Sequence, residues 1–340
     1  MIPHTWPVNL LSSGASAMSD FVGVLRQVPT DEISTEAEQH FRIAVVGARG
    51  AGKSTLIGRL AGGVFAGLLE PFALRRLIEL DAPLSPAGLQ AACECDVVLW
   101  VQDATQPYTD SSFDLLRSQV PAFVNVANKF DLLAGIRNLE FGIRNSVPLC
   151  AESAESVRET LVPAILDAAP DLALALGRSL SIFRPVVAER EIMRVARVNA
   201  EVAVVSAIPQ ASLLLGPISA VADTLLLTKN QAVLLLRLAA LYGLPVDRRR
   251  LTELLPVVGA AFGWRSLARE LVGFVPAGFG VVPKAVIAYA GTVAVGRAAL
   301  WYYETGRKMP ERQLKVLRTA SLREARDFVR DLTRKLRRTG

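Results

Sequence analysis

The stretch at residues 41–57 (FRIAVVGARGAGKSTLI) constrains the fold of this chain more than any other. An apolar run from Ile43 to Val46 is typical of a buried parallel strand and ends at Gly47. The residues from Gly47 to Ser54 then fit the pattern G-x-x-x-x-G-K-[ST] at every specified position. The backbone N–H groups of such a loop cradle phosphate oxygens, and the next helix adds the positive end of its dipole. The sequence therefore predicts a strand, a phosphate-binding loop and a helix.

The residue types in this loop suit a nucleotide with its metal ion. Lys53 is expected to reach the β- and γ-phosphates, and the Ser54 hydroxyl is expected to bind Mg²⁺. The motif lies between a predicted strand and a predicted helix, which favours nucleotide binding over a structural glycine turn. The residues predicted to bind the nucleotide here are Gly47, Arg49, Gly50, Ala51, Gly52, Lys53, Ser54 and Thr55.

Four further apolar segments follow in the rhythm of an α/β sheet, at residues 77–81, 95–101, 121–127 and 146–150. Helical stretches separate them, and a polar residue stands near the end of each. We expect all five segments to be buried strands of a mainly parallel sheet with helices on both faces. Ligands of such sheets bind beyond the carboxyl ends of the strands, where these polar residues lie.

The segment Asn128-Lys129-Phe130-Asp131 follows the fourth of these strands. Together with the loop at residues 47–54, it resembles the G domain of the small bacterial GTPases related to Era and TrmE. The resemblance implies that Asp131 binds N1–H and the exocyclic amine of guanine, that Asn128 braces the loops, and that Lys129 lies along the base. Adenine presents an acceptor at N1 where guanine presents a donor, so a carboxylate favours guanine. The expected ligands are GTP or GDP with Mg²⁺.

The last base-contacting segment of that family, usually Ser-Ala-Lys, corresponds to Cys150-Ala151-Glu152. Cys150 and Glu152 depart from the usual residues. The contact needs only a main-chain donor, so the backbone N–H of Ala151 is still expected to meet O6 of guanine.

The surroundings of the γ-phosphate depart further from the family. Asp81 is expected to hold the Mg²⁺ shell through water, but Leu84 stands where Asp-x-x-Gly requires glycine. No threonine occurs from residue 56 to residue 104 to complete the metal shell, and no residue is assigned to orient an attacking water. We therefore predict nucleotide binding with slow or partner-activated hydrolysis, and leave the catalytic residues unknown.

Length and composition allow two domains and favour a reducing compartment. The chain has 340 residues, of which 51% are hydrophobic. Its three cysteines, Cys93, Cys95 and Cys150, form no disulfide framework, and buried thiols are favoured over a metal site at Cys93 and Cys95. The first twenty residues carry no Lys or Arg and do not match a signal peptide. A cytoplasmic location is expected.

The second half of the chain is strongly apolar. Residues 186–200 form a charged amphipathic segment, residues 203–222 hold no charged residue, and residues 271–296 are interrupted only by Lys284. Either the central helices are buried in a soluble bundle, or a hairpin enters or lies in the bilayer. The pieces at residues 238–245, 274–283, 289–292, 296–298 and 302–306 resemble the YcjF-like domain of unknown function, which implies association with membranes.

The chain ends in a basic segment. Residues 307–340 hold twelve Lys and Arg against four Asp and Glu, so the rest of the chain is slightly acidic, since the whole carries +6. Leu322, Ala325, Phe328, Val329, Leu332 and Leu336 share one face of the predicted helix. Such a helix lies on anionic lipid, or packs on the domain with a solvated basic face. The tail has few aromatic residues, which disfavours nucleic acid as a partner.

Four parts are predicted. Residues 1–40 are an N-terminal extension, with Phe21, Val24, Leu25 and Val28 at helical spacing, which lies on the next domain or is a mobile leader. Residues 41–170 form the G domain, residues 171–306 the hydrophobic helical domain, and residues 307–340 the basic helix. The leading hypothesis is a GTP-binding protein of α/β P-loop NTPase fold, on the inner face of the membrane, either peripheral or hairpin-inserted. The alternatives are a membrane-associated scaffold with a non-cycling nucleotide site and an RNA- or ribosome-associated GTPase; a homo-oligomer or a protein partner stays open.

Overall fold

The computed structural model describes residues 26–62, 76–106, 110–133, 146–205, 226–247 and 281–339, with the single residues 23, 249 and 251. Contacts divide the chain into two compact units. One unit is Thr35–Ala188, and the other combines Met1–Ser34 with Glu189–Gly340. The division therefore falls later than the predicted boundary at residue 170. It also groups Met1–Ser34, which is most of the predicted N-terminal extension, with the helical unit.

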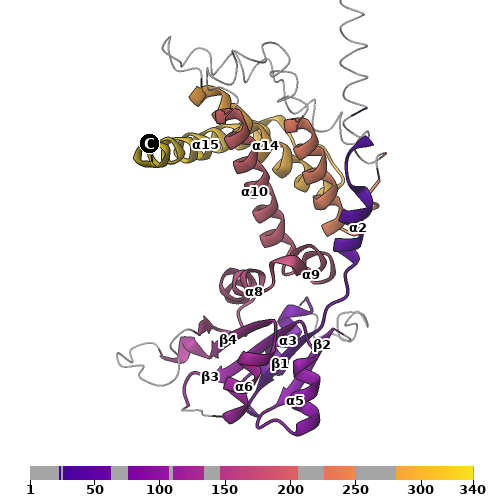
Figure 1. Ribbon diagram of the computed structural model, residues 1–340, viewed down its shortest axis with the longest axis vertical. Helices are drawn as coiled ribbons and strands as arrows, with labels where there is room; N and C mark the ends of the chain where they lie inside the picture. Colours follow the sequence, from indigo (N-terminus) through magenta and orange to yellow (C-terminus); the bar gives the residue numbers. More distant parts are fainter. Residues whose placement is uncertain are drawn as a thin grey trace, which may run out of the picture. The chain divides into compact units, whose positions relative to one another are not determined.

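The first unit is built on five parallel strands in the order β2-β1-β3-β4-β5 (Figure 1). This confirms the predicted α/β class with a parallel sheet, and all five predicted strands are present. The strands are β1 (Ile43–Gly47), β2 (Leu77–Asp81), β3 (Val97–Asp103), β4 (Ala122–Asn128) and β5 (Val147–Leu149).

The prediction that every strand is buried was wrong for the two edge strands, β2 and β5; in β5, Pro148 is exposed. Within the described residues, β2 pairs only with β1 and so forms an edge of the sheet. Leu77 is buried, whereas Glu79 and Asp81 are exposed. A strand at an edge next to one neighbour leaves alternate side chains in water, which explains the acidic residues in this apolar segment.

Helices cover both faces of the sheet. Helices α3 (Lys53–Leu60) and α8 (Val162–Ala168) contact the sheet through β1, β2 and β4. Helices α5 (Pro86–Cys93) and α6 (Ser111–Gln119) pack with alternate residues of β1 and β3 in a cluster around Trp100. Trp100 is fully buried, with the ring of Phe113 edge-on at 5.6 Å between centroids. The carboxyl ends of the strands remain open for polar residues.

Local sequence explains where these helices begin. Ser85 caps α5, since its hydroxyl accepts a hydrogen bond from the backbone N–H of Gly88, and Pro86 occupies the first turn. Asp110 caps α6 in the same way through the N–H of Ser112. The unit closes with α7 (Ala154–Ser156), a π-helical turn (Val157–Leu161), α8 and α9 (Ala173–Ser179).

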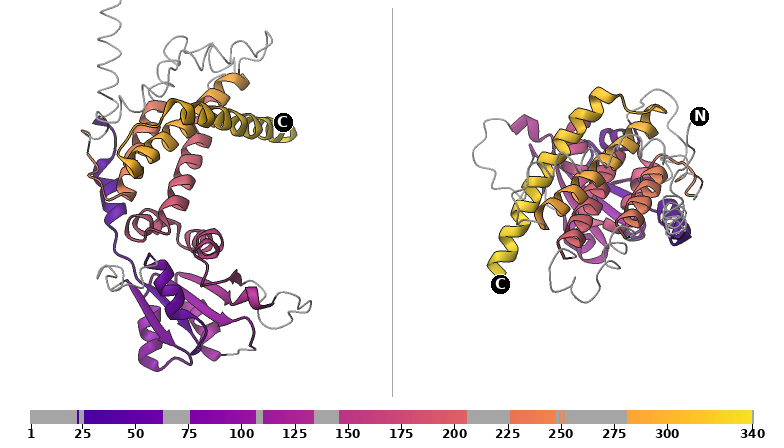
Figure 2. Two further views of the ribbon diagram at one scale, coloured as in Figure 1. Left: turned by 180° about the vertical axis from the view of Figure 1, so that it is seen from behind. Right: turned by 90° about the horizontal axis from the view of Figure 1, so that it is seen from above.

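The helical unit contains most of α10 (Arg184–Val205), a helix at residues 226–241, α14 (Val281–Thr305) and α15 (Glu311–Thr339). Both α10 and α2 (Thr30–Glu38) cross the division between the two units along the chain. Helix α15 packs along α14, as the view from above shows (Figure 2). Its Ala325 and Val329 are buried, and the ring of Phe328 stacks on Tyr289 at 5.0 Å. Ala325, Phe328 and Val329 of the predicted apolar face therefore pack within the protein, whereas Arg323, Arg326 and Arg330 are exposed.

Polar groups join the helices of this unit in its interior. Asn199 of α10 donates to the Thr292 hydroxyl at 2.9 Å, and both side chains are fully buried. Glu191 of α10 accepts two hydrogen bonds from the Arg237 guanidinium, at 3.0 and 3.1 Å. Because each pair joins two helices, these contacts fix how the helices align.

One described helix, Lys284–Thr305, is long and apolar enough to cross a membrane, and the bent pair Ala154–Ala168 and Pro170–Ser179 passes the same test only as one broken span. In Lys284–Thr305, 72% of the apolar window is buried by protein, as in the core helix of a bundle. The parts of the predicted apolar stretches at residues 206–222 and 271–280 lie outside the described residues, as do Phe21, Val24 and Leu25 of the predicted N-terminal helix.

Candidate functional site

The loop between β1 and α3 has the backbone of a tight turn around a small space. A Cβ at Gly47 would overlap the carbonyl oxygen of Val101, so β1 ends against β3 at a distance that only glycine permits. Gly50 and Gly52 have φ values of 84° and 93°, in the left-handed region. Gly52 is also the N-cap of α3 and has no side chain to cap the helix. The first N–H groups of α3 therefore receive no side-chain cap from this residue.

Lys53 lies over this loop and is buried, with 3% of its surface exposed. Its ammonium donates to the carbonyl oxygen of Ala48 at 3.0 Å and lies 2.7 Å from the Asp81 carboxylate. A hydrogen bond from Lys53, with its charge, lowers the pKa of Asp81 below the ordinary value for an aspartate. The loop lysine and the predicted metal-shell aspartate are thus brought into direct contact.

The oxygen atoms beside Lys53 have the chemistry that Mg²⁺ prefers. Ser54 is exposed and donates its hydroxyl to Glu79 at 2.8 Å, and Asp81 lies on the same strand as Glu79. A hydroxyl and two carboxylates are hard ligands, so these residues fit the metal. The described residues contain no group of three or more His, Cys, Asp or Glu side chains placed to hold an ion. Magnesium here would therefore depend on nucleotide phosphates, as is usual for this ion.

Arg49 and Thr55 complete the predicted phosphate contacts. Arg49 is exposed in the loop, and its charge also lowers the pKa of Asp81, though less than Lys53 does. Thr55 is half-buried in the first turn of α3. Ala51 is buried, and its carbonyl oxygen faces β4.

Asn128 connects three segments that are far apart in the sequence. Its side chain is buried, with 3% of the residue exposed. The amide donates to the carbonyl oxygen of Ala51 at 2.8 Å, and its oxygen accepts from the backbone N–H of Ala151 at 2.9 Å. A Cβ at Gly52 would overlap this amide, so the loop glycine also makes room for Asn128. The phosphate loop and the loop after β5 are therefore held together by one side chain.

Lys129 and Asp131 follow Asn128 at the carboxyl end of β4. Lys129 has a φ of 60°, the one positive value among the described non-glycine residues. Its ammonium contacts the Asp103 carboxylate at 2.6 Å. Asp131 is exposed in the short helix Phe130–Leu133. The positive φ of Lys129 turns the chain here, and the side chains of Lys129 and Asp131 remain accessible to solvent.

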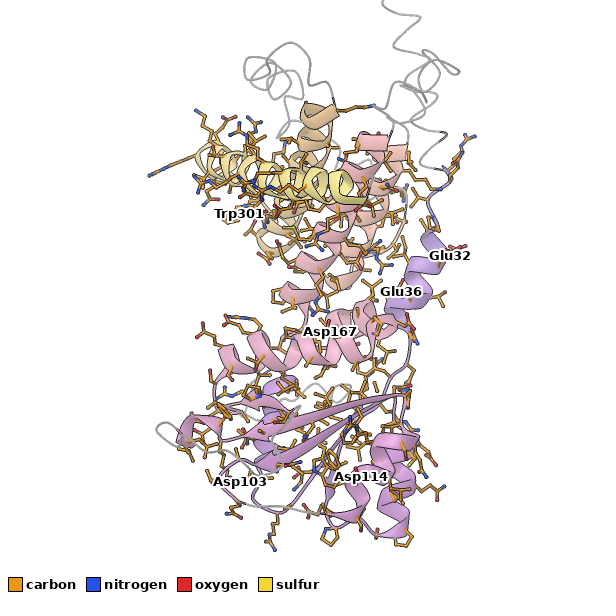
Figure 3. The ribbon with its side chains drawn as sticks, turned by 60° about the vertical axis from the view of Figure 1, so that its left-hand side comes forward. Glu32, Glu36, Asp103, Asp114, Asp167 and Trp301 are labelled. Carbon is orange, nitrogen blue, oxygen red and sulfur yellow. The ribbon has the colours of Figure 1, made fainter. Side chains whose placement is uncertain are left out.

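Asp103 is a site residue that the sequence argument did not assign. It stands at the end of β3 (labelled in Figure 3), and its side chain is 12% exposed. Burial by itself would raise the pKa of Asp103, but hydrogen bonds from Lys129 and from Thr105 outweigh burial, so the pKa is lowered. The signal that could have found it is its position at the end of the strand next to β4.

The predicted contact of Ala151 with O6 of guanine stays a prediction, and two backbone N–H groups of this loop have partners within the protein. The N–H of Ala151 already donates to Asn128, and the N–H of Cys150 donates to the Ser156 hydroxyl at 3.1 Å. In the part of the chain that the structure describes, the N–H of Glu152 has no hydrogen-bond partner.

The segment after β2 is fixed in place. Leu84, where the family has glycine, packs against the cluster around Trp100, and Ser85 caps α5. The backbone N–H of Ala82 donates to the carbonyl oxygen of Gly47 at 2.9 Å. A segment held by a core side chain and a helix cap is poorly suited to turn toward a γ-phosphate, in agreement with the departure seen in the sequence.

The three cysteines form no disulfide within the described part of the chain, and Cys150 lies in the predicted base-contacting segment. All three are free thiols. Cys95 is buried, and burial raises the pKa of its thiol, whereas Cys93 is half-buried and donates to Gln119. Comparison with known proteins adds no family: no protein-family model matches this chain, and no curated protein matches it.

Proposed function

We propose that the α/β unit is a P-loop nucleotide-binding domain that binds GTP or GDP with Mg²⁺, and that hydrolysis is slow or needs a partner. The helical unit associates with the inner face of the cytoplasmic membrane. The observation that carries the first part is the position of Asn128, whose side chain joins the phosphate loop to the loop after β5. This supports the proposal, because one side chain holds together the loop proposed to bind the phosphates and the loop proposed to bind the base.

Guanine is favoured over adenine because Asp131 is an exposed carboxylate two residues after Lys129. The donors at N1 and the exocyclic amine of guanine suit this acceptor. Lys129 is already turned and held by Asp103, so its stem is available to cover a base. The weak point of the site is the γ-phosphate end, where Leu84 is anchored in the core.

A titration with fluorescent GTP, GDP and ATP analogues tests the nucleotide. We expect GTP and GDP to bind in preference to ATP, and Lys53→Ala to abolish binding because the buried ammonium is lost. Arg117→Ala removes an exposed cation from α6 of the same unit and is the matched control. Equal binding of ATP would contradict guanine selectivity, and full binding by Lys53→Ala would contradict the phosphate site.

Phosphate release over hours, with and without vesicles, separates a slow GTPase from a scaffold that binds nucleotide without cycling. Steady turnover excludes the scaffold. No turnover under either condition favours the scaffold, for which the anchored Leu84 is the supporting observation.

The membrane contact is proposed to be peripheral and electrostatic. Helix α15 uses its apolar face against α14, so lipid would meet its exposed basic side chains, such as Arg323, Arg326 and Arg330. Each cation near an anionic surface contributes on the order of 1 kcal/mol, and salt screens this attraction. Sedimentation with vesicles containing phosphatidylglycerol should therefore fall as salt rises. Equal binding to neutral vesicles would contradict this, and RNA retention that is lost on deleting residues 311–340 would favour an RNA-associated protein.

A further inference from the structure

Strand β2 presents two carboxylates on one side, next to the end of the phosphate loop. Glu79 and Asp81 alternate with Ile78 and Leu80, which pack against the cluster around Trp100. The register pairs Glu79 with Val45 and Asp81 with Gly47, the first residue of the loop. The Glu79 and Asp81 side chains are 40% and 71% exposed. Both acids thus stand at the edge where phosphates are expected, and neither is needed for the core.

A positively charged side chain of the protein, that of Lys53, lies beside these two acids. The Lys53 ammonium lies 2.7 Å from Asp81 and 3.9 Å from Glu79. The Ser54 hydroxyl, which the loop motif assigns to Mg²⁺, donates to Glu79 at 2.8 Å. An oxygen atom of Glu79 is therefore in direct contact with the expected first ligand of the metal.

The metal needs further oxygen atoms at this position. Magnesium prefers six oxygen ligands, and no threonine occurs from residue 56 to residue 104 to supply one. We propose that Glu79 takes part in holding the nucleotide-bound Mg²⁺, in place of the missing threonine. This inference rests on the proposed function, since the ion is held together with the phosphates. Asp81 and Ser54 are the other protein groups on this side of the metal.

The direction in which nucleotide affinity changes, with and without Mg²⁺, distinguishes a metal-binding role of Glu79 from a structural one. Without metal, a carboxylate near the phosphates repels them, so removing its charge leaves nucleotide affinity unchanged or improves it. With Mg²⁺ present, the same carboxylate attracts the ion, so removing its charge weakens binding. A contact that only stabilises the fold of the loop would instead give the same loss under both conditions.

The experiment measures GDP affinity of the full chain in excess Mg²⁺ and in EDTA, for the wild type, Glu79→Gln and Glu79→Asp. We expect Glu79→Gln to need roughly 10- to 100-fold more Mg²⁺ for half-maximal GDP retention, and to bind GDP in EDTA at least as well as the wild type. Glu79→Asp keeps the charge and should recover part of the loss. Glu94→Gln is the control, since this exposed acid precedes β3, at the opposite ends of the strands.

Binding of Mn²⁺ to the GDP complex, followed by electron paramagnetic resonance, gives a second readout that does not depend on turnover. Weaker Mn²⁺ binding in Glu79→Gln supports the proposal. An unchanged Mn²⁺ affinity, or an equal loss of GDP affinity in Mg²⁺ and in EDTA, overturns it and leaves nucleotide binding intact. A wild-type chain that binds no guanine nucleotide overturns the proposed function, and this inference with it.

Discussion

The two units of this chain use polar side chains in opposite ways. In the α/β unit, Lys53, Asp81 and Lys129 are gathered at the carboxyl ends of the strands, where each ion pair keeps one member open to solvent: the Asp81 side chain is 71% exposed and that of Lys129 is 36% exposed. In the helical unit, the buried side chains of Asn199 and Thr292 pair with each other across helices, and the buried Glu191 pairs with Arg237. The first arrangement leaves groups that a ligand can recruit. The second leaves no such group at these positions, because each of these buried side chains already has its partner and exposing it would cost stability.

The comparison predicts that substitutions in the helical unit reduce stability without changing nucleotide affinity. The largest effect is expected for Glu191→Ala, which leaves Arg237 and Arg194 without their shared carboxylate. Breaking a buried ion pair by removing one partner costs about 3 kcal/mol or more. Urea unfolding monitored by circular dichroism measures the loss.

The matched control is Glu201→Ala, an exposed acid on the same helix, which should change stability by less than about 0.5 kcal/mol. Acid gives an independent check. Burial raises the pKa of Glu191, but Arg237 and Arg194 outweigh it, so the folded pKa is lowered. The stabilisation is therefore complete above the unfolded value of about 4.3 and is lost as pH falls through the lowered folded value. Glu191→Gln should not show this loss of stability in acid. If a substitution at Glu191 weakened GDP binding and left stability unchanged, the contrast between the two units would be wrong.

Asn128 is the residue that combines both kinds of behaviour, since it is buried and also lies in the site. Asn128→Ala removes two hydrogen bonds and leaves a buried carbonyl and a buried N–H unpaired, at about 1 to 3 kcal/mol. We expect both the free energy of unfolding and GDP affinity to fall. Asn125→Ala, on the same strand but bonded to Gln102, should reduce stability alone. Full GDP affinity in Asn128→Ala would make its role purely structural.

Asp103→Asn tests the proposal that Lys129 lies along the base of the nucleotide. The amide can still accept from Thr105, but it lacks the charge that holds the ammonium. Water around the partly exposed Lys129 limits the loss of GDP affinity to about 1 kcal/mol. Pyrophosphate, which has no base, should bind as before. Asp114→Asn on α6 is the exposed control (Figure 3), and equal losses for GDP and pyrophosphate would show that Asp103 acts on the whole fold.

The smallest effect is expected on the surface of α15. Arg330 pairs with Asp327 at 2.6 Å, with both side chains more than half exposed. Arg330→Ala should change the free energy of unfolding by no more than about 0.5 kcal/mol but weaken binding to anionic vesicles. Asp327→Asn breaks the same pair and should strengthen vesicle binding, because it removes a negative charge. Parallel changes in the two variants would exclude an electrostatic contact.

Much of the first unit could be predicted from local patterns. Five apolar segments became five strands because each was bounded by turn or helix residues, and the glycine pattern gave the loop its left-handed residues. The exposure of Glu79 could not be predicted, since it depends on β2 having one neighbour. The engagement of the Ala151 N–H by Asn128 was also missed, because a contact between distant residues leaves no local signal.

The second unit was less predictable for the same physical reason. Apolar composition in α14 suits a membrane span and a core helix equally well, and only the neighbours decide between them. The apolar face of α15 correctly predicted a helix. That α14 covers this face could not be predicted, because it depends on contacts between helices such as the stacking of Phe328 on Tyr289.

The double hydrogen bond of Asn128 also has a thermodynamic consequence. If one side chain aligns the loop for phosphates and the loop for the base, a ligand at either end orders part of the other. Coupling between two sites is reciprocal, so pyrophosphate would raise the affinity for guanosine by the same factor that guanosine raises the affinity for pyrophosphate. Titrating each fragment in the presence of the other measures this factor, and removing the Asn128 amide should bring it to one.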